Sequence, residues 1–137
     1  MNTIEKLTPY DQLGGEVGLR ALVNRFYELM DELPEAFTVR KFHPENLTGA
    51  ATSLFEYLSG WFGGPELYIA KKGHPRLRMR HAPYAIDSIV RDEWMMCMTQ
   101  ALNEEVADSN FRDEIIDTFA KMANHLVNTN DNHRCIA

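Results

Sequence analysis

The chain has 137 residues, of which 45% are hydrophobic and 25% are charged, a length and composition typical of a folded protein with one buried core. Its formal net charge of -6 at pH 7 argues against nucleic acid as the main partner, because phosphate binding depends on clustered Lys and Arg. The first ten residues lack the apolar core of a signal peptide, and no run of roughly 18 apolar residues predicts a membrane span. We therefore expect one cytoplasmic domain over residues 1–137, with its core at about 9–128 and no membrane partner.

Helix signals are clear in the first third of the chain. Thr-Pro at 8–9 predicts a helix start, and the Gly-Gly pair at 14–15 predicts its interruption. Apolar residues then recur at three- and four-residue steps over 19–33, which predicts one buried helical face ending before a proline. A short segment over 35–42 closes before Pro44, because a residue that precedes proline is pushed out of the helical region.

The middle of the chain changes from strong to weak periodicity. From Leu47 to Trp61 apolar residues cover so much of a predicted helix that we expect burial on more than one side, and Gly-Gly-Pro at 63–65 ends this helix. Residues 65–83 contain three prolines and little periodicity. They are predicted to form a long loop with one short helical turn at 76–81, and loops of this length are often functional.

Two further helices are predicted in the last third. Asp87 or Ser88 caps the first, which runs to about Val106, and the second spans about 110–128, before a polar tail at 130–137. The inner side of the first is expected to carry Ile89, Val90, Trp94, Met95, Met98 and Leu102. The second is expected to bury Phe111, Ile115, Ile116, Phe119, Met122, Ala123 and Leu126. No segment alternates as a half-buried strand does, so the fold class is all-α, and the period alone fits either a bundle or a globin-like sandwich.

Histidines are the side chains best suited to carry chemistry in this sequence. His125 on the last helix and His133 in the tail fit solvated or hydrogen-bonded roles, and a turn next to proline accounts for His43 and His74. His81 follows three arginines at alternate positions and precedes Ala-Pro. Imidazole ligates iron, and such cations could pair with the propionates of a haem. On these residues alone, haem ligation stays one open alternative beside an ordinary structural role.

Two other features could serve a ligand. Five cations and no acid lie between Lys71 and Arg80, an island in an acidic chain that could meet a small anion. Tyr27 and Trp94 each carry a polar group that needs a partner when the ring is buried, and in a pocket the ligand can supply that partner. The simpler interpretation is that the cations are solvated and that both rings fill the core.

Several motifs occur together in the order typical of one family. They are Trp61-Phe62-Gly63-Gly64-Pro65, then the stretch from Gly73-His74-Pro75 through Arg80-His81-Ala82-Pro83-Tyr84, then Arg91-Asp92-Glu93-Trp94 and Cys97-Met98. With Tyr10-Asp11, Gly14-Gly15 and Arg25-Phe26-Tyr27 upstream, this pattern closely resembles the group II truncated haemoglobins over roughly residues 9–128. Motifs of this length and order are very specific.

The resemblance implies a truncated globin fold, in which a two-over-two sandwich of helices surrounds a b-type haem. The first helix of the globin fold would be nearly lost, and the proximal helix would be reduced to a turn inside a loop. The chain has no Cys-x-x-Cys-His motif, so the haem would be held without a covalent bond. Cys97 and Cys135 lack metal-site spacing and are expected to remain thiols.

The resemblance also implies roles for individual residues. His81 matches the proximal iron ligand. Arg80 is expected to pair with a haem propionate, and the other expected haem contacts are Tyr68, Lys72, Arg76, Leu54, Tyr84 and Trp94. The distal ligand pocket is expected to contain Tyr27, Trp94, His43, Leu54 and Ala50. His43 would add a titratable donor to this pocket. Ala50 stands where many other globins have a distal histidine, so it donates no side-chain hydrogen bond.

The function implied is reversible binding of O2, and of NO and CO, at ferrous haem, with distal donors that stabilise the ligand. The alternative is a haem enzyme for NO dioxygenation or peroxide detoxification. Because the sequence contains no flavin- or NAD-binding extension, a redox cycle would need an external reductase as partner. A helical interaction module without a cofactor is a third hypothesis, but it leaves the arginines beside His81 unexplained.

Overall fold

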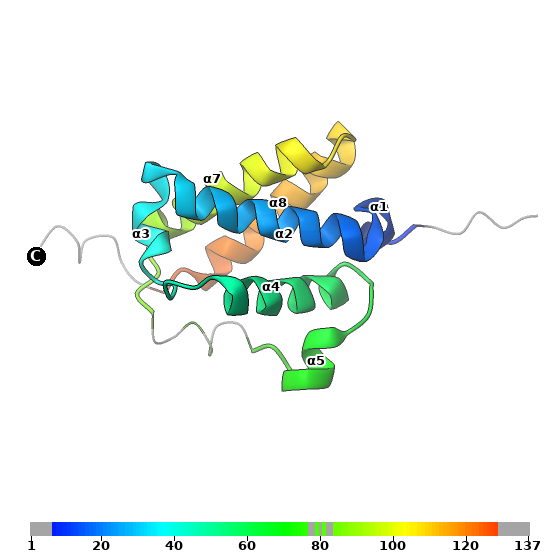
Figure 1. The fold of residues 1–137 in the computed structure, drawn as a ribbon, viewed down its shortest axis with the longest axis horizontal. Helices are drawn as coiled ribbons and strands as arrows, with labels where there is room; N and C mark the ends of the chain where they lie inside the picture. Colours follow the sequence, from blue (N-terminus) through cyan, green and yellow to red (C-terminus); the bar gives the residue numbers. More distant parts are fainter. Residues whose placement is uncertain (1–6, 77–78, 80, 82–83, 129–137) are drawn as a thin grey trace, which may run out of the picture.

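The computed structural model describes residues 7–76, 79, 81 and 84–128, and within these residues it contains helices and no strand. Four long helices form the body (Figure 1): α2 (Gly15–Glu32), α4 (Thr48–Trp61), α7 (Ser88–Glu105) and α8 (Ser109–Leu126). The predicted all-α class is therefore confirmed. No helix in the described part of the chain is long and apolar enough to cross a membrane.

The long helices form two antiparallel pairs. α2 runs against α4 in one pair, and α7 runs against α8 in the other, which crosses behind α2 in Figure 1. α2 is the central helix, because it packs against both α7 and α4. The sequence left a helical bundle and a globin-like sandwich open, and this arrangement of two helices over two is the globin-like sandwich.

The chain enters the body through a short helix, α1 (Pro9–Gln12). The Thr8 hydroxyl accepts a hydrogen bond from the backbone N–H of Asp11, whose carboxylate accepts one from the N–H of Thr8, so a capping box starts this helix. Gly14 and Gly15 follow with φ of 102° and 67°, a backbone conformation that glycine adopts without strain. The predicted helix start and Gly-Gly interruption are both confirmed.

A close approach ties α1 to the end of α4. The backbone N–H of Tyr10 donates to the carbonyl of Phe62 at 2.9 Å. A Cβ atom at Gly64 would lie 2.5 Å from the Tyr10 ring, so only glycine permits this contact. The Gly-Gly-Pro stop after α4 thus also serves packing between two helices.

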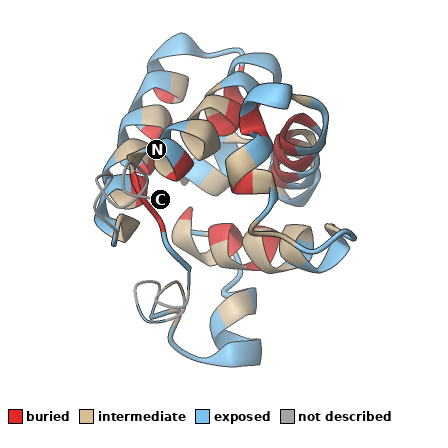
Figure 2. Ribbon diagram, turned by 90° about the vertical axis from the view of Figure 1, so that its left-hand side faces the viewer, coloured by how far each residue is buried: buried red, intermediate tan, exposed pale blue. Residues whose placement is uncertain are grey.

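The core lies where α2, α7 and α8 meet, as the buried segments in Figure 2 show. The predicted inner face of α2 is confirmed for Leu19, Leu22, Val23, Phe26, Leu29 and Met30, all buried. Each large apolar side chain that is buried in this way contributes roughly 1.5–3 kcal/mol. On α8, the predicted residues Phe111, Ile115, Phe119 and Ala123 are buried, whereas Ile116, Met122 and Leu126 are half-buried.

The segment after α2 forms two short helical turns, η1 (Pro34–Ala36) and α3 (Phe37–Arg40), and ends before Pro44 as predicted. α3 packs against α7. The short segment therefore holds the residues just before His43 against the core.

The expectation of a long loop with a single turn over 65–83 is wrong in one respect. Residues Leu67–Lys72 form a helix, α5, which packs against α4 and has no buried residue. Tertiary contacts stabilise it, because Lys71 forms an ion pair with Glu56 and the Lys72 amine donates to the Ser53 hydroxyl at 2.9 Å. A helix of this length, with no buried face, shows no apolar period in the sequence. The predicted turn at 76–81 lies partly outside the described residues, of which Met79 and His81 are helical.

α7 begins as predicted but faces the core differently. The Asp87 side chain accepts from the N–H of Val90 at 3.1 Å, so Asp87 rather than Ser88 is the cap. The expectation that Ile89 faces inward is wrong, since it is 43% exposed, whereas its neighbour Val90 is buried. Cys97 is buried as a free thiol. Cys135 and the predicted tail lie outside the described residues.

Candidate functional site

Tyr27 and Trp94 pack on the same buried ring. Phe26 of α2 is fully buried, and the Tyr27 ring meets it edge-on at 4.8 Å between centroids. Trp94 of α7 meets Phe26 from the neighbouring helix at 5.0 Å, also edge-on. The crossing of α2 and α7 therefore brings together the two polar aromatic residues that the sequence analysis assigned to one pocket.

Both polar groups lack a hydrogen-bond partner within the part of the chain that the structure describes. Neither the Tyr27 hydroxyl nor the Trp94 indole N–H forms a hydrogen bond with the described residues. In the same part of the chain, Arg112 Nε is the one fully buried side-chain polar atom without a partner, so the hydroxyl and the indole N–H both border accessible space. Burial raises the pKa of Tyr27 well above its usual value. The phenol therefore keeps its proton and remains a donor at any physiological pH.

His43 lies beside Tyr27, with its ring 5.8 Å from the Tyr27 ring. Its Nδ1 atom is 3.0 Å from the carbonyl oxygen of Val39. Burial lowers the pKa of His43, outweighing the hydrogen bond to Val39, which raises it, and the charges of Arg40 and His81 lower the pKa further.

One side chain of α7 fixes the segment that carries His43. Glu93, next to Trp94 in sequence, accepts a hydrogen bond from the backbone N–H of Val39 at 2.8 Å. Val39 is the residue whose carbonyl holds His43. The carboxylate of Glu93 therefore links the position of His43 to the helix that carries Trp94.

α4 presents an apolar row that the neighbouring helices α5 and α8 cover only in part. Ala50, Leu54, Tyr57 and Trp61 share one helical face and are only half-buried, whereas Phe55 and Leu58 on another side of α4 are buried. The sequence predicted burial on more than one side of this helix. The half-buried row is the side on which the protein alone does not complete that burial.

A hollow of about 690 Å³ opens beside this row. Its lining comes from α4, α5, residues 74–79 and α8: Glu56, Tyr57, Gly60, Trp61, Glu66, Tyr68, Ile69, His74, Pro75, Arg76, Met79 and His125. Tyr68 and Arg76, two of the expected haem contacts, therefore share one cavity. Lys72, a third, lies over the Tyr68 ring at 5.2 Å. The volume is typical of a site for a small molecule or a cofactor.

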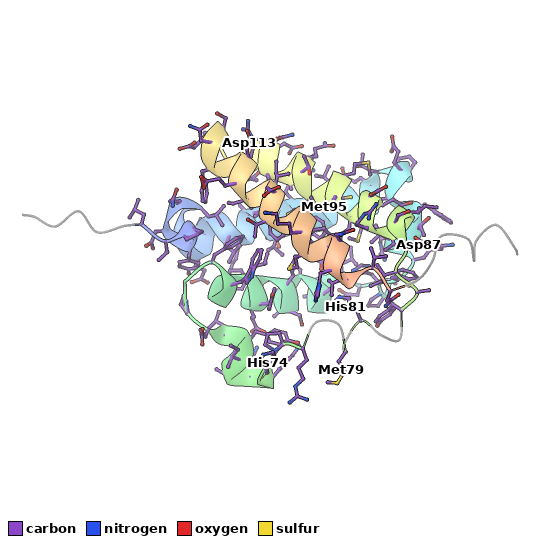
Figure 3. The ribbon with its side chains drawn as sticks, turned by 180° about the vertical axis from the view of Figure 1, so that it is seen from behind. His74, Met79, His81, Asp87, Met95 and Asp113 are labelled. Carbon is purple, nitrogen blue, oxygen red and sulfur yellow. The ribbon has the colours of Figure 1, made fainter. Side chains whose placement is uncertain are left out.

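His81 lies just beyond Met79 and is half-buried. In Figure 3 its side chain is directed toward α4 and the end of α8, whereas Met79 points away from them. The carbonyl of His81 accepts hydrogen bonds from the N–H of Tyr84 at 2.9 Å and from the Asn128 side chain at 3.3 Å. Arg80 lies outside the described residues, so its expected pairing with a propionate has no structural test.

The remaining candidates are more scattered. Tyr84 is 45% exposed and lies against the Phe42 ring at 5.9 Å, away from the lining of the hollow. His74 accepts at Nδ1 from the N–H of Arg76 at 3.1 Å, as expected for a turn, although its side chain also lines the hollow. Sequence reasoning did not single out Glu93 or Asn128, whose roles depend on contacts with backbone groups far away in the sequence.

These residues fit a haem. The α4 row and the neighbouring hollow offer apolar and aromatic surface for a flat macrocycle. Two cations lie at the hollow, since Arg76 lines it and Lys72 lies over the lining residue Tyr68. The described residues hold no group of three or more His, Cys, Asp or Glu side chains able to bind a bare metal ion. A haem iron needs only an axial ligand from the protein, because the porphyrin supplies four nitrogens, and His81 can be that ligand. The fold and the site thus define a haem-binding globin.

Comparison with known proteins agrees with this class. The family model described as bacterial-like globin matches residues 8–128. The cold-adapted truncated haemoglobin of the Antarctic bacterium Pseudoalteromonas haloplanktis TAC125 is 44% identical, with a TM-score of 0.88 over 90% of this chain and 99% of that one. The group II 2-on-2 haemoglobin of Agrobacterium tumefaciens is 41% identical, with a TM-score of 0.89 over 93% and 99%. Group 2 truncated haemoglobin YjbI of Bacillus subtilis (strain 168) is 33% identical over 120 residues, 88% of each chain.

The chain therefore belongs to the bacterial-like globin family, as a group II truncated haemoglobin. Haem binding follows from the family, as does binding of diatomic gases such as O2. The two-over-two arrangement of helices is the truncated globin fold predicted from the motifs.

Proposed function

We propose that this protein binds b-type haem without a covalent bond, with His81 as the iron ligand, and that it reversibly holds O2 and also accepts NO and CO. Tyr27 and Trp94 donate hydrogen bonds to the gas, and Ala50 and Leu54 form the apolar part of the distal pocket. The same proposal places the protein in the cytoplasm. One observation carries this proposal. The Tyr27 hydroxyl and the Trp94 indole N–H, whose rings both pack against Phe26, have no hydrogen-bond partner among the described residues.

Hydrogen-bond donors beside the iron would favour a polar gas over an apolar one. A haem held here would supply the iron that bonds to the gas, and the two donors would act on the polar end of that ligand. A neutral hydrogen bond contributes about 1 kcal/mol to such a ligand, and a donor fixed beforehand needs no rearrangement. Both rings pack edge-on against Phe26, which restrains them. Two fixed donors therefore favour O2 over less polar CO.

His81 is tested by haem content. We expect purified protein reconstituted with haem to show a Soret band, and His81→Ala to lose most of its haem in gel filtration. His74→Ala and His125→Ala are matched controls, because both side chains line the hollow and neither is assigned to iron. Equal haem retention in His81→Ala and wild type would refute the assignment, and loss in a control variant instead would identify another ligand.

Peroxide detoxification is the second candidate, and one observation favours it. Because Nδ1 of His43 faces a carbonyl, Nε2 of the neutral ring is an acceptor. Hydrogen peroxide carries a proton that such an atom can accept, whereas O2 does not. Turnover would require a reducing co-substrate or an external reductase, and NO dioxygenation would require a reductase as well. Peroxide-dependent oxidation of a phenolic dye, compared between wild type and His43→Phe, tests this candidate.

A further inference from the structure

Asn128 joins the end of the chain's last helix to the segment that carries His81. Its backbone N–H donates to the carbonyl of Ile86 at 2.9 Å, and its Oδ1 accepts from the N–H of Ile86 at 2.9 Å. Its Nδ2 donates to the carbonyl of Tyr84 at 3.0 Å and to that of His81 at 3.3 Å. Four hydrogen bonds thus connect one residue to three positions between His81 and α7.

The chemistry of these bonds requires asparagine. The side chain must accept from one N–H and donate to two carbonyls, and a carboxamide is the short side chain that does both. This pattern also fixes the orientation of the amide, because the reverse assignment would set an NH2 group against the N–H of Ile86. Aspartate would place a carboxylate oxygen against the carbonyls of His81 and Tyr84.

The hydrogen bonds of Asn128 hold the backbone at His81 in place. The segment after His81 leads to the α7 cap Asp87, which is buried and fixed by its bond to Val90. The carbonyl of His81 is held by the N–H of Tyr84 and by Asn128. The backbone from which the imidazole projects is thus fixed to α8.

We propose that Asn128 is a positioning residue for the proximal histidine, which sets the orientation of the His81 imidazole by holding the carbonyl of that residue and the carbonyl of Tyr84. This inference rests on the proposed ligation of iron by His81. Asn128 acts through the backbone and does not touch the ligand. The orientation of the imidazole that would meet the iron therefore depends on a residue just after α8.

The test compares Asn128→Asp and Asn128→Ala with Asn124→Ala. Asn124 is a matched control, because it lies on the last turn of α8 and its Oδ1 accepts from Arg91 of α7 at 2.9 Å, and among the described residues it forms no hydrogen bond with His81, Tyr84 or Ile86. Resonance Raman of the ferrous, ligand-free protein reports the stretching frequency of the iron–histidine bond. We expect a shifted or broadened band in both Asn128 variants and an unchanged band in the control.

Two further measurements separate this inference from the proposed function. Haem transfer to an acceptor globin should be about fivefold faster in the Asn128 variants, the factor that corresponds to one lost hydrogen bond. In haem-free protein, the amide of Tyr84, which donates to the His81 carbonyl, should exchange faster with solvent. If His81→Ala keeps its haem, the ligation fails, and this inference falls with it. If His81→Ala loses haem but the band and the transfer rate of Asn128→Asp and Asn128→Ala match the control, only the role of Asn128 is overturned.

Discussion

The Nδ1 atom of His43 lies 3.0 Å from the carbonyl oxygen of Val39, one helical turn earlier in the chain. A carbonyl only accepts hydrogen bonds, so Nδ1 must carry the proton. In the neutral ring Nε2 then holds a lone pair. His43 can therefore act as the expected donor through Nε2 only when its ring is charged. Burial opposes that charge.

We expect NMR to find neutral His43 with its proton on Nδ1. Long-range nitrogen–proton correlation spectra of the ferrous CO form, which is diamagnetic, distinguish the two tautomers directly. At neutral pH, His43→Phe should then change O2 release less than Tyr27→Phe does, because it removes no donor. A proton on Nε2 of the neutral ring would contradict this assignment.

The lowered pKa of His43 also predicts a pH dependence of stability. Because the folded protein binds this proton less readily than the unfolded chain, whose pKa is about 6.5, the neutral ring contributes stability that is present above that pH. This stability is lost as the pH falls from the unfolded pKa toward the lower folded one. Urea unfolding of the CO form between about pH 7 and 5 should show a flatter curve for His43→Phe than for wild type. His125→Gln, which removes an exposed histidine of α8, is the control, and a curve flattened as much as that of His43→Phe would contradict the role of His43.

Tyr27 and Trp94 should act together on O2 release. Tyr27→Phe and Trp94→Phe each remove one donor worth about 1 kcal/mol, which corresponds to roughly fivefold faster O2 dissociation. CO is less polar when bound, so its dissociation should change less. Stopped-flow rates for both single variants and the double variant test this, and non-additive effects would indicate one shared network. Equal responses of the two gases would mean that the donors do not touch the ligand.

Phe26 has no polar atom but should affect the same rates. Phe26→Leu keeps an apolar side chain and removes two edge-on ring contacts, each worth about 0.5–1.5 kcal/mol. We therefore expect a loss of stability of about 1–3 kcal/mol and faster O2 release, because both donors lose their support. Phe55→Leu is the control, since Phe55 is buried on α4 and packs under Arg20. If the control changes O2 release as much as Phe26→Leu does, the effect is one of general stability.

Arg80 should pair with a haem propionate, as the motif implies. Arg80→Glu is expected to accelerate haem loss by up to about fivefold at low salt, because a pair at the solvent edge is worth at most about 1 kcal/mol. The effect should shrink at high salt. Arg78→Glu makes the same change of charge two residues away. Equal rates in both variants would assign the effect to net charge rather than to a contact.

Local features of the sequence determined most of the helices and the candidate residues. Helix spans follow from the spacing of apolar residues, and the caps at Thr8 and Asp87 depend on hydrogen bonds three residues away. The motifs around His81 and Trp94 identified the family, and with it the cofactor, because their order is specific to it. These features are readable because each depends on neighbours along the chain.

Only the tertiary structure decided the remaining points. α5 forms because Lys71 and Lys72 contact α4, and Ile89 is exposed because the core packs on the side of α7 that carries Val90, Cys97 and Met98. The proton on His43 is set by the carbonyl of Val39, a residue whose backbone N–H donates to Glu93 of another helix. Asn128 gains its role from backbone groups more than forty residues away. A pattern of residue types records which groups are present, but packing decides which of them meet.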